Sequence, residues 1–202
     1  AARYDAARQL DRIEAFADAL GLARFHLGGN SMGGYLATLY AARAPHRVAS
    51  LWLLAPAGVL SADVSETFDL IAAGSNPLVY TDASGFERLG RLCFCRQPWL
   101  PPRFREPLIA RARAEAPFSL KIFDEMFSDF VGLEEAAAGL GTRALVVWGD
   151  DDRVLHPSGL ERLRGVLAAA EFRLMARMGH VPQIERPAET AADFLRFHGR
   201  TA

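Results

Sequence analysis

Residues 24–44 of this 202-residue chain read RFHLGGNSMGGYLATLYAARA. Residues 24–28 predict a short buried strand, and residues 35–44 have the composition of a helix that stops before a proline. The residues between them match the G-x-S-x-G pattern of a sharp turn from strand to helix: Gly29-Asn30-Ser31-Met32-Gly33. A strand, this turn and a helix in direct succession favour a parallel sheet covered by helices.

The pentapeptide predicts Ser31 as a nucleophile. Such a turn holds the serine in a strained backbone conformation and lifts its Oγ above the edge of the sheet. Side chains at positions 29 and 33 are expected to collide with the adjoining strand and helix, so both Gly29 and Gly33 are expected to be required. The turn also directs the backbone N–H of Met32 toward a developing oxyanion. The alternative is a glycine-rich turn that binds a ligand or merely packs tightly.

A serine hydroxyl needs a general base, and histidine is the usual one. His180 follows Gly179 in a loop between the last predicted strand and the last predicted helix. That position puts it at the carboxyl edge of the sheet, where the serine turn also opens. The other histidines are expected to be structural or exposed: His26, His46, His156 and His198.

The base needs an acidic partner, and three aspartates follow the predicted strand 144–148. They are Asp150, Asp151 and Asp152. Aspartate is common in turns, so at least two of the three are expected to serve the turn alone. The loop after the other apolar strand, residues 55–58, has no carboxylate, so the acid is expected from this cluster.

The rest of the chain alternates strands and helices on both sides of a long insert. Further strands are predicted at 48–54, 144–148 and 172–175, and further helices at 4–20, 158–169 and 187–197. This alternation predicts an α/β protein with a mostly parallel sheet flanked by helices.

The insert, residues 61–140, is rich in proline and aromatic residues and has no predicted strand. Helical pieces are predicted near 64–73, 84–93, 104–115 and 118–130. We therefore expect a core formed by 1–60 and 141–202, with 61–140 as a helical cap inserted between strands. Aromatic and apolar residues of the cap are candidates for lining an acyl pocket, although most are expected to pack the cap onto the core: Phe94, Trp99, Leu100, Phe123, Met126, Phe127 and Phe130.

Three blocks of the chain resemble the signatures of the α/β-hydrolase superfamily. They are GNSMGG at 29–34, WGDDDRV at 148–154 and GHVPQIERP at 179–187. The resemblance extends over about residues 4–199 and implies the order serine, aspartate, histidine, with Asp152 as the acid and no cofactor or metal. Residues 56–58 and the Phe/Met-rich insert resemble monoacylglycerol lipases and related bacterial esterases. That likeness implies hydrolysis of small or lipid-like carboxylic esters through an acyl-enzyme.

The superfamily has further strands before the segment matched here, including the loop that carries the second oxyanion donor. No such segment is found, and the chain does not begin with Met. We therefore expect the fold to be incomplete at its N-terminus, with the second donor upstream. Any membrane association is expected only through that missing segment, which leaves a cytoplasmic or peripheral membrane location, in a bacterium, as the expectation.

Two other functions compete with an esterase. Carbon–carbon bond hydrolases of ring-cleavage products resemble the same serine motif, but they usually carry an aromatic residue directly after the histidine, where Val181 stands here. A non-catalytic binding module of this fold typically loses a member of the triad, and this sequence keeps all three.

Composition excludes several other classes. Lys and Arg number 23 against 24 Asp and Glu, without a basic run, so no nucleic-acid partner is expected. Cys93 and Cys95 are one residue apart, which disfavours a disulfide between them and matches no zinc-ligand spacing. No apolar run is long enough to span a membrane.

Overall fold

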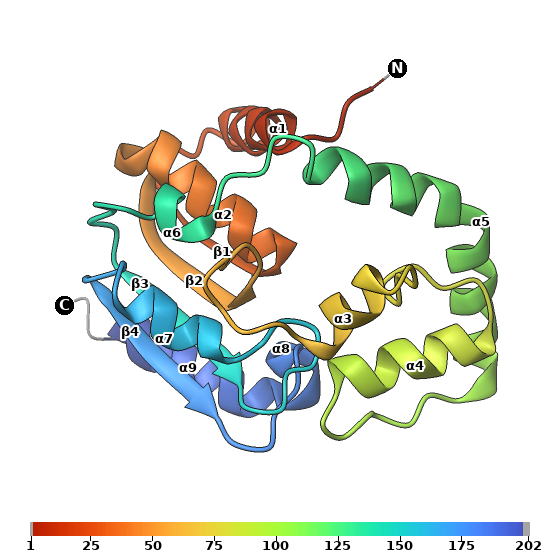
Figure 1. Ribbon diagram of the computed structural model, residues 1–202. Helices are drawn as coiled ribbons and strands as arrows, with labels where there is room; N and C mark the ends of the chain where they lie inside the picture. The colour runs from red at the N-terminus through yellow and green to blue at the C-terminus, as the bar shows by residue number, and fades with distance from the viewer. Residues whose placement is uncertain (1, 200–202) are drawn as a thin grey trace.

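The computed structural model describes residues 2–199; residues 1 and 200–202, part of the predicted core ranges, lie outside the described residues. Four parallel strands form one sheet in the order β1–β2–β3–β4 (Figure 1). The strands are β1 (Phe25–Ser31), β2 (Val48–Pro56), β3 (Ala144–Gly149) and β4 (Ala170–Met175). The predicted parallel α/β architecture is confirmed.

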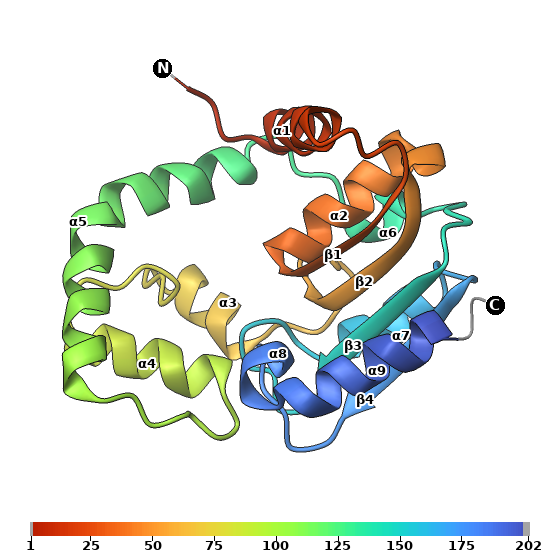
Figure 2. The same cartoon turned by 180° about the vertical axis from the view of Figure 1, so that it is seen from behind.

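Helices cover both faces of this sheet. One face packs against α1 (Ala6–Ala19), α2 (Met32–Arg43), α6 (Leu133–Ala136) and α7 (Ser158–Arg164). The opposite face packs against α9 (Pro187–Gly199), which Figure 2 shows lying along β3 and β4. Two shorter helices complete the core, η1 (Pro45–Arg47) and α8 (Pro182–Glu185).

The central strands are apolar on both faces because each face carries its own helical layer. In β2, Leu53 belongs to the larger core cluster and Leu54 to the smaller one on the opposite face. In β3, Val146 and Val147 divide in the same way. Full burial of each such side chain contributes about 1.5–3 kcal/mol. The near-continuous apolar runs of the sequence therefore reflect strands covered on both sides.

The insert between β2 and β3 contains α3 (Glu66–Ala72), α4 (Ala83–Cys93) and α5 (Pro102–Met126) before α6. Figure 1 shows α3, α4 and α5 to one side of the sheet, with α5 arching from the end of α4 back toward α1. No strand occurs in the insert, all of which the structure describes.

One expectation for the insert is corrected. The helices predicted at 104–115 and 118–130 are the single helix α5, which continues through Pro107 and Pro117. A proline removes one backbone hydrogen bond and bends a helix, but it does not oblige the helix to end. In addition, α6 and the residues after it pack with the core: Leu133, Ala137 and Leu140 belong to the main core cluster, and α6 contacts α2.

Within residues 2–199, β1 is an edge strand that pairs only with β2. Among the helices of the same residues, none is long and apolar enough to cross a membrane.

Candidate active site

Ser31 ends β1 and occupies the N-cap position of α2, without a capping hydrogen bond from its side chain. Its backbone has φ 55° and ψ −120°, a conformation in the left-handed range of φ that a residue with a side chain rarely adopts. Its carbonyl accepts a hydrogen bond from the N–H of Ala57 at 3.0 Å, and Pro56 is its partner in the β1–β2 register. The serine therefore lies in the strained turn that the motif predicts.

The structure requires glycine at positions 29 and 34 of this turn. A Cβ atom on Gly29 would overlap the backbone of Gly33, and a Cβ on Gly34 would lie 2.9 Å from the Cβ of Pro56. The expected collision at Gly33 is wrong, because a Cβ there would meet nothing within 4 Å. Gly34 is the buried position of α2 that faces β2, whereas Gly33 faces open space.

His180 and Asp152 form a buried pair. The Nδ1 atom of His180 lies 2.8 Å from Oδ2 of Asp152, and the two residues are 5% and 4% exposed. The other carboxylate oxygen accepts the backbone N–H groups of Val154 at 2.9 Å and Leu155 at 3.0 Å. Because both oxygens are engaged, the carboxylate is fixed in the orientation that serves the imidazole.

The two neighbouring aspartates have other partners. Asp150 accepts the backbone N–H of Met178 at 3.4 Å, and Asp151 lies 3.4 Å from the side chain of Arg153. Among the three aspartates, Asp152 is the one in contact with His180, in agreement with the expectation from the WGDDDRV block.

Asn30 connects the serine turn to the histidine loop, which the sequence analysis did not anticipate. Its side-chain amide donates to the carbonyl of Leu54 at 2.9 Å and to the carbonyl of His180 at 3.0 Å. Within residues 2–199, no hydrogen bond joins the Ser31 hydroxyl to His180, and Asn30 provides a contact between the serine turn and the histidine loop. Catalytic hydrogen bonds often tighten only when substrate is bound.

Met32 supplies the first backbone N–H of α2, and its side chain is exposed. The first N–H groups of a helix have no partner within the helix and point along its positive end. This position suits the predicted role of Met32 as a donor to an oxyanion.

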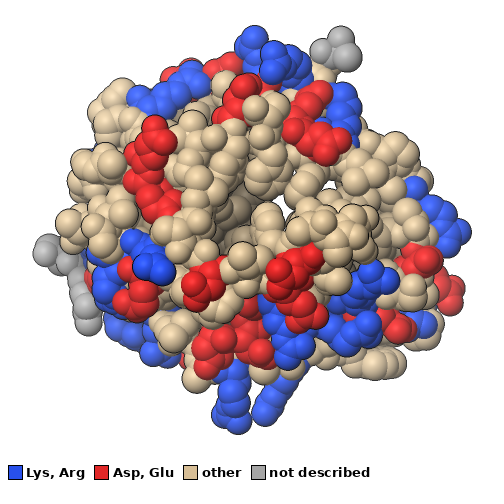
Figure 3. All heavy atoms as spheres, viewed as in Figure 1, with Lys and Arg blue, Asp and Glu red and all other residues tan. Residues whose placement is uncertain are grey.

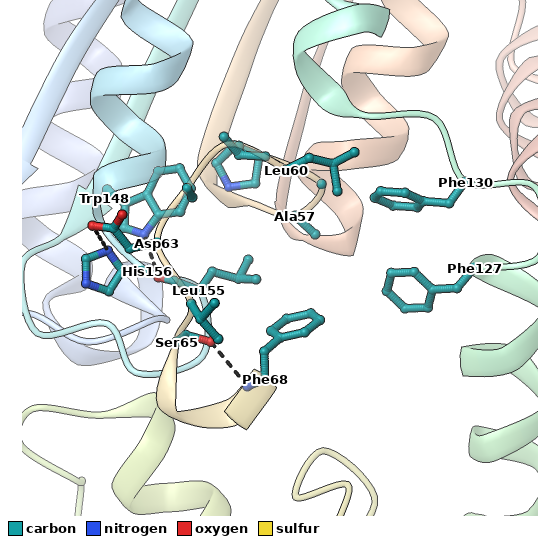
Figure 4. A pocket seen from close by; sticks show the side chains of 15 residues that line it. Ala57, Leu60, Asp63, Ser65, Phe68, Phe127, Phe130, Trp148, Leu155 and His156 are labelled. Atoms are coloured by element: carbon teal, nitrogen blue, oxygen red, sulfur yellow. Dashed lines mark hydrogen bonds and ion pairs between the residues drawn. The ribbon is translucent and has the colours of Figure 1, made fainter. Parts of the chain in front are cut away.

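A cavity of about 360 Å³ lies beside the loop after β2 (Figure 4), and its lining residues do not include Ser31, Asp152 or His180. Pro56, the partner of Ser31, and Leu155, whose N–H binds Asp152, both line it. Most of the lining is apolar: Ala57, Gly58, Val59, Leu60, Ala62, Val64, Phe68, Phe127, Phe130 and Trp148, with Asp63, Ser65 and His156 as the polar members. Figure 3 shows the same side of the molecule hollowed near its centre, with charged residues mostly around the rim.

The cap residues proposed as pocket lining divide into two groups. Phe127 and Phe130 line the cavity, and Figure 4 shows both rings facing Phe68 and Leu60 across it. Five others do not line it: Phe94, Trp99, Leu100, Phe123 and Met126.

Four of these five residues have identifiable environments elsewhere in the structure. Trp99 is 82% exposed, and Met126 is 2% exposed within the core cluster. Phe123 packs on Phe127 with ring centroids 4.7 Å apart, so it supports a lining residue. Phe94 caps the end of α4 beside Gly179. The loops after β2 and β3 provide most of the lining instead, because they leave the sheet at the edge where Ser31 lies.

Both cysteines lie beside the aspartate cluster as free thiols. Burial, together with the negative charge of Asp152, raises the pKa of Cys93 to about 12. Burial also raises the pKa of Cys95, with a further contribution from a hydrogen bond to Asp151. The end of α4 is therefore in close electrostatic contact with the residues that hold His180.

Curated lipases are similar to this chain over most of its length. Lipase 3 of Moraxella sp. (strain TA144) is 32% identical over 200 residues, which cover 97% of this chain and 63% of the lipase. A monoacylglycerol lipase of Bos taurus is 31% identical over 201 residues, covering 93% of this chain and 60% of that protein. The chain thus spans about three-fifths of the length of these curated relatives.

Solved structures are similar over nearly the whole chain. The crystal structure of a membrane phospholipase A, described as a novel bacterial virulence factor, is 41% identical with a TM-score of 0.95, covering 100% of this chain and 66% of that one. A meta-cleavage product hydrolase is 23% identical with a TM-score of 0.82, a likeness that shows the fold alone. The model of the alpha/beta hydrolase fold family matches residues 2–187. This chain therefore belongs to the alpha/beta hydrolase fold family.

Proposed function

We propose that this protein hydrolyses lipid-like carboxylic esters, with Ser31 as nucleophile, His180 as general base and Asp152 as the residue that orients the base. The observation that carries the proposal is the buried 2.8 Å contact between Asp152 and His180, tied through Asn30 to a serine in a strained turn. A structural histidine needs no such combination.

The reaction follows from these positions. The Nε2 atom of His180 takes the proton of the Ser31 hydroxyl while Oγ attacks the ester carbonyl, and the imidazolium then protonates the leaving alcohol. Water, activated by the same imidazole, attacks the acyl-enzyme and releases the acid. Asp152 fixes the ring through Nδ1 and stabilises the imidazolium with its negative charge, while Val154 and Leu155 hold its other oxygen.

The N–H of Met32 is proposed as one oxyanion donor, because it lies at the positive end of α2 directly after the nucleophile. In this fold the second donor comes from a loop between earlier strands. For this protein, a second donor upstream of residue 1 stays a prediction.

The cavity supports a substrate with an aliphatic acyl chain. Its volume of about 360 Å³ falls in the range of small-molecule sites, and its lining includes no Lys or Arg that could pair with an anionic substrate. The names of the curated relatives, a bacterial lipase and a monoacylglycerol lipase, support the same substrate class. We propose that the acyl chain lies between the loop after β2 and the rings of Phe68, Phe127 and Phe130.

The test is covalent labelling combined with turnover. The full chain is treated with a fluorophosphonate probe and assayed with p-nitrophenyl esters of increasing acyl length, with Ser31→Ala as the control. We expect labelling at Ser31 alone and a loss of turnover of roughly 10⁶-fold in the variant. Turnover in Ser31→Ala within tenfold of the parent would contradict the assignment.

A further inference from the structure

The cap contacts the histidine loop directly through backbone groups. The N–H of His180 donates to the carbonyl of Cys93, at the end of α4, with a distance of 2.8 Å. The approach is so close that a Cβ on Gly179 would overlap the Cys93 carbonyl and lie 2.8 Å from Cα of Phe94. The backbone of the proposed general base is therefore held by the cap as well as by the core.

Glu185 joins the same two segments with its side chain. Its Oε1 accepts the N–H of Arg96 at 2.8 Å, and its Oε2 accepts the N–H groups of Cys95 at 3.2 Å and Gly179 at 3.1 Å. Two of these donors belong to the cap and the third directly precedes His180. One carboxylate thus bridges segments that lie more than 80 residues apart in the chain.

A carboxylate suits this position better than any other side chain. Three backbone N–H groups converge on it, and an ionised carboxylate offers only acceptors, which makes these bonds stronger than those to a neutral group. A glutamine would turn an NH₂ group toward at least one of the donors. An aspartate would keep the charge but would be shorter by one methylene.

The short helix α8 transmits the position of Glu185 to His180. Helix α8 begins at Pro182, two residues after His180, and ends at Glu185, whose own N–H bonds to the carbonyl of Val181 at 3.0 Å. A displacement of the cap at 93–96 would therefore displace the loop that carries the base on both sides, at Gly179 and at Glu185.

We propose that Glu185 is a positioning residue that clamps the cap segment 93–96 to the histidine loop 178–181, so that the cap and His180 move together. Glu185 does not touch the reacting atoms and acts through His180. The proposal therefore rests on the proposed function, which makes His180 the general base. Its consequence is that a substrate which shifts the cap also alters the alignment of the base.

The experiment compares Glu185→Gln and Glu185→Asp with Glu189→Gln in the full chain. Glu189 is the matched control, because its carboxylate contacts the side chains of Arg173 and Arg186 and not the cap. In Glu185→Gln we expect hydrogen exchange of the amides in 93–96 and 178–181 to rise at least tenfold. We expect kcat to fall by about 10–100-fold, because a small misplacement of a catalytic group has an effect of that size, with KM changed less than about threefold.

A second readout needs no turnover. The proton between His180 Nδ1 and Asp152 gives an NMR resonance, and its exchange with water should become faster in Glu185→Gln but stay unchanged in Glu189→Gln. Glu185→Asp, which keeps the charge, should lie between the parent and Glu185→Gln in every measurement. If Glu185→Gln fails to fold, Glu185→Asp takes its place, with the same directions expected.

Each outcome decides the proposal. Unchanged exchange at 93–96 and 178–181 would overturn the clamp, and increased exchange with kcat and the imidazole resonance unchanged would overturn the positioning role. If the parent protein neither hydrolyses esters nor labels at Ser31, the proposed function fails. The exchange and resonance measurements then decide on the clamp alone.

Discussion

The side-chain amide of Asn30 donates a hydrogen bond to the carbonyl of His180, 150 residues further along the chain, at 3.0 Å. The same amide donates to the carbonyl of Leu54 in β2. Asn30 directly precedes the proposed nucleophile, so one side chain links the serine turn to the loop of the proposed base. Asn30 therefore has a structural role that the G-x-S-x-G pattern does not specify.

We predict that Asn30→Ala lowers kcat/KM for a p-nitrophenyl ester by about 10–100-fold, because the His180 loop loses its link to the turn. Asn30→Asp should cost more, since a carboxylate would face two carbonyl oxygens without a proton to donate. Steady-state kinetics and thermal unfolding of both variants check the prediction. An Asn30→Asp variant as active as the parent would contradict it.

The aspartates provide a second prediction. Asp152→Asn should lower kcat by about 10⁴-fold, because the imidazole loses both its orienting acceptor and the charge that stabilises its protonated form. Asp151→Asn should stay within about threefold of the parent, since Asp151 contacts the exposed side chain of Arg153. Kinetics of the two variants at one pH are sufficient, and a larger loss in Asp151→Asn than in Asp152→Asn would reverse the assignment.

The main features of the fold and the proposed triad could be predicted from local sequence. Strand, turn and helix around Ser31 follow from composition over about twenty residues, and Asp152 and His180 follow from loops that come after strands of one parallel sheet. The carboxyl ends of such strands meet at one edge, so order along the chain is enough to bring these residues together.

The remaining features depend on contacts between distant segments. Gly34, and not Gly33, needs to be glycine because of the face of α2 that packs on Pro56, which the G-x-S-x-G pattern does not specify. The cavity is lined mainly by loops after β2 and β3, whereas aromatic content alone pointed to the cap. The contacts of Glu185 with Cys95 and Arg96 join segments about 90 residues apart, and local sequence patterns do not predict such pairs.

The thiol of Cys93 offers a test of the environment around Asp152. Its pKa is raised to about 12, first by burial and then by the charge of Asp152, so the neutral thiol is favoured in the folded state. The thiolate is the reactive form, so at pH 8 its fraction is lower than in the unfolded chain by roughly 10³-fold. In a Cys95→Ala background, we predict that iodoacetamide modifies folded Cys93 at least 100-fold more slowly than urea-unfolded protein.

The raised pKa of Cys93 has two further consequences, one for the pH dependence of stability and one for the effect of the Asp152 charge. Because the folded pKa lies above the unfolded one, this thiol stabilises the fold fully only below the unfolded value, and the contribution is lost as pH rises toward 12. Asp152→Asn should lower the pKa of Cys93 and speed its modification. Modification of the folded Cys95→Ala variant within tenfold of its unfolded rate would show that Cys93 is not buried as described.

The cavity predicts how acyl-chain preference can be changed. Ala57 lines it next to the nucleophile, since its N–H donates to the carbonyl of Ser31. Ala57→Leu adds three carbon atoms to the lining and should displace two or three methylenes of a long acyl chain. Each buried methylene contributes about 0.8 kcal/mol, so kcat/KM for a decanoyl ester should fall by roughly 10–50-fold relative to an acetyl ester.

The control for this change is Ala114→Leu, which adds the same side chain on the exposed surface of α5, away from the cavity. It should leave the ratio of decanoyl to acetyl turnover within about twofold of the parent. The measurement is kcat/KM over a series of p-nitrophenyl esters from acetyl to decanoyl. If Ala57→Leu lowers turnover of all chain lengths equally, the acyl chain does not occupy this cavity, and the cavity would have to accommodate the alcohol part of the ester instead.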